Sequence, residues 1–118
     1  MSLKSGVDLI NDAKAKIREV SARDAVENPE PGTVYFDCRE PNEYALAHIP
    51  GAVFIPRGNL ETKIEAVIPR DRKVLIYCAS GNRSALAADT MQQMGYTDVA
   101  SMAGGIRGWI DAGGEIES

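Results

Sequence analysis

Residues 76–84, Ile-Tyr-Cys-Ala-Ser-Gly-Asn-Arg-Ser, join two segments of different periodicity. Before them, Val74 to Tyr77 form a short apolar run of β-branched and aromatic side chains, which is typical of a buried strand. After them, residues 85–94 carry small or apolar side chains at helical spacing, and Gly95 provides a C-terminal stop. Cys78 is therefore expected where a strand ends and a short loop leads into a helix.

The segment that follows Cys78, residues 79–84, has a composition suited to binding an anion, and we call it the cysteine loop. Its first residues, Ala79, Ser80 and Gly81, are small enough for the backbone to curve closely around a sulfur atom. The start of the next helix offers unpaired backbone N–H groups and the positive end of the helix dipole. Because such donors stabilise a thiolate, the reactive form of cysteine, the pattern predicts that Cys78 is a nucleophile.

The composition narrows the classes of protein to which the chain can belong. Its 118 residues, 44% hydrophobic and 25% charged, are sufficient for one globular domain with its own core. A formal net charge of −4 argues against general nucleic-acid binding, and no apolar run approaches the roughly 18 residues of a membrane span. The N-terminus lacks the apolar segment of a signal peptide, so a cytoplasmic location is expected. The two cysteines and the single histidine show no metal-site spacing, and neither a metal nor a cofactor is expected.

Short apolar strands alternate with helices along the chain. Strands are expected at 18–20, 33–37, 52–55, 74–77 and 98–101, and helices at 5–17, 22–27, 41–47, 60–67, 83–94 and 106–112. This alternation predicts an α/β fold, with a mainly parallel central sheet flanked by helices on both faces. Residues 1–17 are expected to form a helical extension and residues 18–118 the domain. Functional residues of such sheets collect at the carboxyl ends of the strands, where Asp37, Arg57 and Cys78 are expected.

Three ordered motifs resemble those of the rhodanese family of sulfurtransferases. The first runs from Asp37-Cys38-Arg39-Glu40-Pro41-Asn42-Glu43-Tyr44 into His48-Ile49-Pro50-Gly51-Ala52, the second spans Cys78 to Ser84, and the third is Gly104-Gly105-Ile106-Arg107-Gly108-Trp109. The likeness covers residues 18–112 and implies a single rhodanese-like domain, similar to thiosulfate sulfurtransferases, with an added N-terminal helix. The sequence departs from the family pattern at Cys38, where an aliphatic residue is common, and at Ala47, where glycine usually precedes the histidine.

The resemblance implies that Cys78 is the catalytic residue of a sulfurtransferase. Its thiolate would attack the outer sulfur of a small anionic donor such as thiosulfate, and the resulting persulfide would pass the sulfur to an acceptor. Cyanide, sulfite, a small thiol and a thiol-bearing protein are candidate acceptors. The substrate would be bound through backbone N–H groups by the whole cysteine loop: Ala79, Ser80, Gly81, Asn82, Arg83 and Ser84. Arg83 has two candidate roles, which are to lower the pKa of Cys78 or to bind the oxyanion end of the donor.

Other residues near the expected strand ends are given smaller roles. Arg57 is a candidate second contact for the anion, with an ordinary solvated loop residue as the alternative. Asp37 and Arg39 are two residues apart and are expected to support the loop structure as a hydrogen-bonded ion pair. His48 is expected to pack locally without a catalytic role, and Trp109 is expected in the core.

Cys38 has two interpretations. The family topology places its strand beside that of Cys78, so Cys38 is a candidate to resolve a Cys78 persulfide or to form a reversible disulfide with it. The favoured interpretation is a structural thiol that replaces a core valine and points away from Cys78. A Cα separation above ~7 Å would exclude the disulfide without backbone movement.

Two other classes of function stay open. Cysteine-dependent phosphatases and arsenate reductases on the same fold place a cysteine and an arginine in a similar loop, typically with five residues between them. Here four residues, 79–82, separate Cys78 from Arg83, which favours the smaller sulfur atom over a tetrahedral phosphate. The other alternative is a sulfur carrier or binding module that serves a partner protein, although binding modules of this fold usually lack the cysteine.

Overall fold

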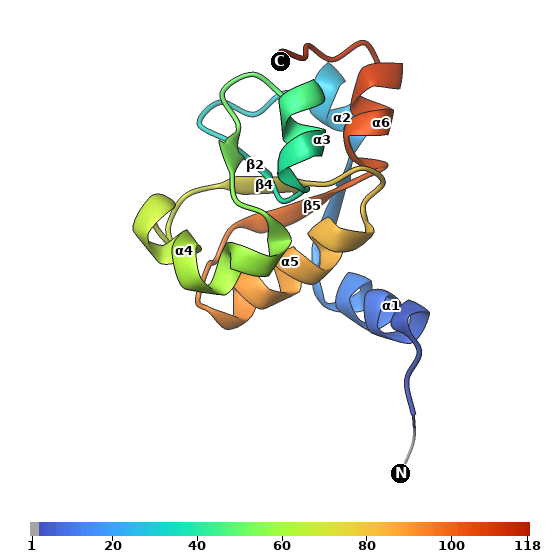
Figure 1. Ribbon diagram of the computed structural model, residues 1–118, viewed down its shortest axis with the longest axis vertical. Coiled ribbons are helices and arrows are strands. Elements are labelled where there is room, and N and C mark those ends of the chain that lie inside the picture. Colours follow the sequence, from blue (N-terminus) through green and yellow to red (C-terminus); the bar gives the residue numbers. More distant parts are fainter. Residues whose placement is uncertain (1–2) are drawn as a thin grey trace.

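A parallel five-stranded sheet forms the centre of the computed structural model, which describes residues 3–118 (Figure 1). The strands lie in the order β1-β5-β4-β2-β3, so that β4 occupies the middle. Their bounds are β1 Arg18–Ser21, β2 Val34–Asp37, β3 Val53–Phe54, β4 Val74–Tyr77 and β5 Val99–Ala103. The parallel sheet confirms the α/β class expected from the sequence.

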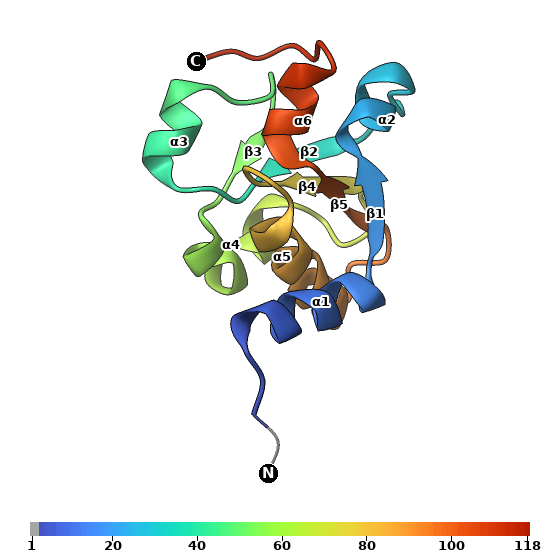
Figure 2. The same cartoon turned by 90° about the vertical axis from the view of Figure 1, so that its right-hand side faces the viewer.

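Helices cover both faces of the sheet, as predicted. Their bounds are α1 Gly6–Lys16, α2 Ala22–Glu27, α3 Pro41–Leu46, α4 Leu60–Val67, α5 Asn82–Gln93 and α6 Gly105–Asp111, with a 3₁₀ turn η1 at Arg57–Asn59. Figure 2 shows α4 and α5 on one side of the sheet and α2 and α6 on the other, with α1 packed against the outside of α5. Within residues 3–118, no helix is long and apolar enough to cross a bilayer.

The alternation of side chains along β4 determines which way Cys78 points. All four residues of the strand are buried, but they belong to two separate cores. Val74 and Ile76 pack with α4 and α5, whereas Leu75 and Tyr77 pack with α2 and α6. Because successive side chains of a strand point to opposite faces, the next residue, Cys78, joins the core beneath α5.

Local rules account for most element boundaries. Ser5 and Ser21 are N-caps, since their hydroxyl groups accept hydrogen bonds from the backbone N–H groups of Asp8 (3.1 Å) and Asp24 (3.0 Å). The strand 74–77 and the helix 60–67 have the expected bounds. These elements depend on sequence patterns that are complete within a few residues.

The boundaries that differ from expectation depend on tertiary contacts. α5 begins at Asn82, one residue before the expected start at Arg83, because Gly81 adopts a left-handed conformation with φ +111° and acts as its N-cap. β5 ends at Ala103 and not at Ser101, because its last residues continue to pair with β1. β3 has only two residues, and η1 follows it where no helical turn was expected.

Candidate active site

Cys78 lies at the carboxyl end of the central strand and faces the N-terminus of α5. Its Sγ accepts hydrogen bonds from the backbone N–H groups of Gly81 (3.1 Å) and Ser84 (3.4 Å). The hydroxyl group of Ser84 lies 3.4 Å from the same sulfur. The cysteine loop therefore surrounds the sulfur with donors, as its small residues and the following helix predicted.

This environment changes the acidity of the Cys78 thiol. Burial by itself raises the pKa, because it disfavours the charged form. Hydrogen bonds from the Ser84 hydroxyl and from the backbone N–H groups of Ser84, Gly81 and Ser80 act in the opposite direction and outweigh it. The pKa of Cys78 is therefore lowered from its ordinary value, which increases the fraction of reactive thiolate at neutral pH.

A second buried hydroxyl group extends this network. Ser101, in the middle of β5, is fully buried, and its Oγ lies 2.8 Å from the Oγ of Ser84. If Ser101 donates to Ser84, the hydroxyl group of Ser84 is free to donate to the sulfur. The sequence analysis gave Ser101 no role, although a serine inside an apolar strand is itself a signal, because a buried hydroxyl group needs a partner.

The third sequence motif fixes the base of the cysteine loop. The backbone N–H of Ile106, at the start of α6, donates to the carbonyl oxygen of Cys78 (2.9 Å), and that of Arg107 donates to Ala79 (3.3 Å). Gly105 comes so close that an added Cβ would lie 2.4 Å from the Ala79 oxygen and 2.5 Å from the Cys78 oxygen. Only glycine fits this position, so the motif determines where the loop lies.

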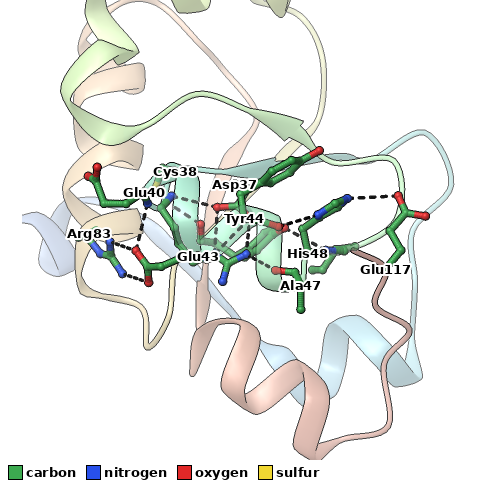
Figure 3. A network of polar contacts seen from close by, with 12 residues as sticks. Asp37, Cys38, Glu40, Glu43, Tyr44, Ala47, His48, Arg83 and Glu117 are labelled. Carbon is green, nitrogen blue, oxygen red and sulfur yellow. Dashed lines mark hydrogen bonds and ion pairs between the residues drawn. The ribbon is translucent and has the colours of Figure 1, made fainter.

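Arg83 is paired with a carboxylate. Its guanidinium donates two hydrogen bonds to Glu43 on α3, with distances of 2.8 Å to Oε1 and 3.0 Å to Oε2 (Figure 3). The hydrogen bond from Arg83 is the largest cause that lowers the pKa of Glu43 to about 2, so the carboxylate is ionised at neutral pH. The sequence analysis gave Glu43 no role, and its pairing with a residue 40 positions away has no local signal.

A buried ion pair positions α3 and therefore Glu43. Asp37, at the end of β2, is fully buried and accepts a 2.7 Å hydrogen bond from Arg39. The same guanidinium donates to the carbonyl oxygen of Ala47, just beyond α3. The two residues thus bridge both ends of α3, which is the supporting geometry that the sequence suggested for them.

His48 lies just beyond the C-terminal end of α3. Its ring stacks on Tyr44 with a centroid separation of 3.9 Å, and its Nδ1 lies 2.9 Å from the carbonyl oxygen of Tyr44. Its backbone pairs with Glu117 near the C-terminus. The contacts with Tyr44 match the local packing expected for His48, whereas its pairing with the distant Glu117 was not expected. Trp109 is buried between α6 and the sheet, which confirms its predicted place in the core.

Cys38 lies beside Cys78, one residue beyond β2. The strand register pairs Asp37 with Tyr77, and the backbone N–H of Cys38 continues this ladder to the Tyr77 oxygen (3.2 Å). Both thiols are free and belong to the same core, so Cys38 does not turn to the opposite face of the sheet. Its Sγ donates to the Tyr77 carbonyl (3.5 Å), and burial is the largest cause that raises its pKa.

The remaining residues predicted to contact the substrate lie partly in the cysteine loop and partly outside it. Ser80 and Asn82 are exposed and Ala79 is half-buried. The guanidinium of Arg57 donates hydrogen bonds to Glu61 (3.0 Å) and to Thr90 on α5 (3.2 Å). Thr90 is eight residues beyond the start of α5, or roughly 12 Å along the helix. A role for Arg57 in anion binding therefore stays a prediction.

A cysteine whose sulfur accepts hydrogen bonds from loop N–H groups, at the carboxyl end of a parallel sheet, places the chain in a class of α/β proteins with a cysteine loop at this edge. The family model described as "Rhodanese-like domain" matches residues 21–112, which include all three sequence motifs and the cysteine loop. The chain belongs to this family, and the resemblance noted in its sequence is confirmed.

Individual relatives carry names related to sulfur chemistry. The chain is 34% identical over 110 residues to "Putative sulfur carrier protein YrkF" of Bacillus subtilis (strain 168), a match that covers 91% of this chain and 58% of YrkF. It is 30% identical over 98 residues to the thiosulfate:glutathione sulfurtransferase of Saccharomyces cerevisiae, covering 73% of this chain and 70% of the yeast protein. The chain thus spans little more than half of YrkF and most of the yeast enzyme.

A solved structure matches almost the whole fold. RPA3614 from Rhodopseudomonas palustris CGA009, called a protein of unknown function and possible tyrosine phosphatase, has a TM-score of 0.87 and 35% sequence identity. The match covers 99% of this chain and 97% of RPA3614, so it includes α1 as well as the sheet.

Proposed function

We propose that this chain is a sulfurtransferase that moves sulfane sulfur from a donor such as thiosulfate to a nucleophilic acceptor through a persulfide on Cys78. The observation that carries the proposal is the arrangement of donors around Cys78 Sγ, where two backbone N–H groups and a serine hydroxyl stabilise the thiolate. The sulfurtransferase name of the yeast relative supports the same chemistry. We further propose that residues 1–17 are an extension to a domain formed by residues 18–118.

The proposed reaction has two steps. The Cys78 thiolate attacks the outer sulfur of thiosulfate, a new S–S bond forms on Cys78, and the old S–S bond breaks with its electron pair leaving on sulfite. A thiolate, sulfite or cyanide acceptor then attacks the outer sulfur of the persulfide and regenerates the thiolate. The N–H groups of the cysteine loop stabilise the anionic sulfur in both states, so no separate general base is needed.

The experiment that tests this proposal is intact-mass analysis of the purified chain after incubation with thiosulfate, and again after cyanide is added. The expected result is a gain of one sulfur atom that maps to Cys78 and disappears with cyanide. Cys78→Ser is the control and should gain no sulfur. Failure of the wild type to gain sulfur from thiosulfate or from any persulfide would contradict the proposal.

Two alternative functions have specific support. The possible phosphatase RPA3614 shares the fold, and a cysteine followed by an arginine is present here. Against this alternative, Arg83 is already paired with Glu43, which would compete with a phosphate. Hydrolysis of a phosphate ester without a sulfur adduct would favour the phosphatase alternative.

The name of YrkF supports a sulfur carrier, which would form the same persulfide but release it only to a protein partner.

A further inference from the structure

The one charged side chain of the cysteine loop, Arg83, forms an ion pair with Glu43. Arg83 is the one charged side chain among residues 78–84. Glu43 binds it through both carboxylate oxygens, at 2.8 and 3.0 Å, and the two side chains are only 36% and 28% exposed. Bidentate pairs of this kind have the strongest geometry available to arginine and a carboxylate. Together they present no net positive charge to an incoming anion.

Glu43 is held in place independently of Arg83. It is the third residue of α3, where its Oε1 accepts a 3.0 Å hydrogen bond from the backbone N–H of Glu40. The ends of α3 are bridged by Arg39, which is itself bound to the buried Asp37. Displacing the carboxylate from Arg83 would therefore disturb the start of α3 as well as the ion pair.

This arrangement affects sulfur donors unequally. Thiosulfate is a dianion that leaves as sulfite. Arg83, the loop cation that could bind its oxyanion end, is already paired with Glu43. A dianion that reaches the loop also lies beside the Glu43 carboxylate, and like charges brought together are destabilising. The persulfide of an uncharged thiol has no oxyanion end, so it needs only the N–H groups around Cys78 Sγ.

We propose that Glu43 is a specificity-determining residue that makes the site favour persulfides of uncharged thiols over the thiosulfate dianion. The inference rests on the proposed sulfurtransferase function and names its donor class. In the favoured reaction, the Cys78 thiolate attacks the terminal sulfur of a persulfide R–S–SH. The S–S bond breaks, the thiolate RS⁻ leaves with the electron pair, and the proton stays on the transferred sulfur.

The test compares two donors, thiosulfate and 2-hydroxyethyl persulfide, in single-turnover measurements of the rate at which Cys78 gains sulfur. Glu43→Gln removes the charge but keeps an oxygen that can accept from Glu40 and Arg83. We expect the variant to react about tenfold faster with thiosulfate and within about twofold of the wild-type rate with the persulfide. Glu65→Gln is the matched control, because Glu65 also pairs with an arginine, Arg70, but lies on α4 and is 55% exposed. It should change neither rate.

The outcomes separate this inference from the function on which it rests. If Glu43→Gln leaves the ratio of the two rates unchanged, or slows both equally, Glu43 does not select the donor, although Cys78 still carries sulfur. If neither donor transfers sulfur to the wild type, the proposed function fails together with the inference.

A second measurement needs no variant. Sulfate is a dianion that cannot donate sulfur, so it reports whether Arg83 is open to such ions. We expect sulfate not to inhibit the reaction of the wild type with 2-hydroxyethyl persulfide. Strong competitive inhibition by sulfate would mean that the site accepts dianions despite Glu43, and would overturn the proposal.

Discussion

Cys38 and Cys78 follow neighbouring parallel strands at adjacent positions, yet their thiols have opposite properties. They are 0% and 1% exposed, so burial does not distinguish them. The pKa of Cys38 is raised, chiefly by burial, whereas the pKa of Cys78 is lowered because hydrogen bonds outweigh burial. The difference lies in the segment that follows each cysteine.

After Cys78 the chain turns directly into α5 and directs its N–H groups at the sulfur. After Cys38 the next N–H group, that of Arg39, donates to Asp37, and Cys38 itself acts as a donor to the Tyr77 carbonyl. A position at the end of a strand is therefore insufficient to lower the pKa of a buried cysteine. The pKa of the cysteine depends on whether the next few backbone N–H groups donate hydrogen bonds to its sulfur or to another atom.

The largest effect expected from this comparison is on activity. Cys78→Ser should reduce sulfur transfer by about 10³-fold or more, because the nucleophile is lost. Cys38→Ala should leave the transfer rate unchanged and cost about 1 kcal/mol of stability, since only a small buried side chain is removed. Steady-state assays and chemical denaturation of both variants measure these effects. A Cys38→Ala variant without activity would show that the two cysteines act together.

A second substitution tests how strongly α6 holds in place the cysteine loop, the segment that distinguishes Cys78 from Cys38. Gly105→Ala places a Cβ against the Ala79 and Cys78 carbonyl oxygens at a residue with φ +58°. We expect a loss of about 3 kcal/mol or more in the free energy of unfolding, measured by chemical denaturation. Gly58→Ala is the matched control, because its added Cβ meets no atom within 4 Å and should change stability little.

The serine hydroxyl groups should have intermediate effects on the acidity of Cys78. Removing the hydroxyl group in Ser84→Ala raises the pKa of Cys78, so the rate of persulfide formation below that pKa should fall by about tenfold, the value of one hydrogen bond to an anion. Ser101→Ala acts only through Ser84 and should lower the rate by about twofold to threefold. The pH profile of the first step distinguishes this from a general loss of structure, because both variants should recover at high pH. An unchanged profile in Ser84→Ala would show that the backbone donors alone are sufficient.

The smallest effect concerns the ion pair between Glu43, on the helix that follows Cys38, and Arg83 of the cysteine loop. The Glu43 carboxyl has its pKa lowered from 4.5 to about 2, so the pair stabilises the fold fully above pH 4.5, and this stability is lost as the pH falls toward 2. Glu43→Gln should therefore be less stable than the wild type by about 1 kcal/mol at neutral pH, and the difference should vanish near pH 2. Denaturation at several pH values measures this. A difference that is independent of pH would assign the effect to packing.

Much of this comparison could be predicted from the sequence. The strand 74–77, the small residues of the cysteine loop and the helix after it are local patterns, and they predicted the sheet and a Cys78 sulfur that faces backbone donors. That Cys78 is a nucleophile stays a prediction. The start of α5 was predicted to within one residue, and the difference depends on the left-handed Gly81. Glu43 and Ser101 were missed for a different reason, since each acquires its role from a partner on another element. Local patterns do not record such pairings.

The most direct test of the account is the ultraviolet titration of thiolate absorbance in the two single-cysteine variants, Cys38→Ala and Cys78→Ala. The account predicts that the cysteine in Cys38→Ala, which is Cys78, ionises below the ordinary pKa of a thiol. The cysteine in Cys78→Ala, which is Cys38, should ionise only well above that value or when the chain unfolds. Equal pKa values for the two cysteines would contradict the claim that the loop after Cys78 makes it the reactive one.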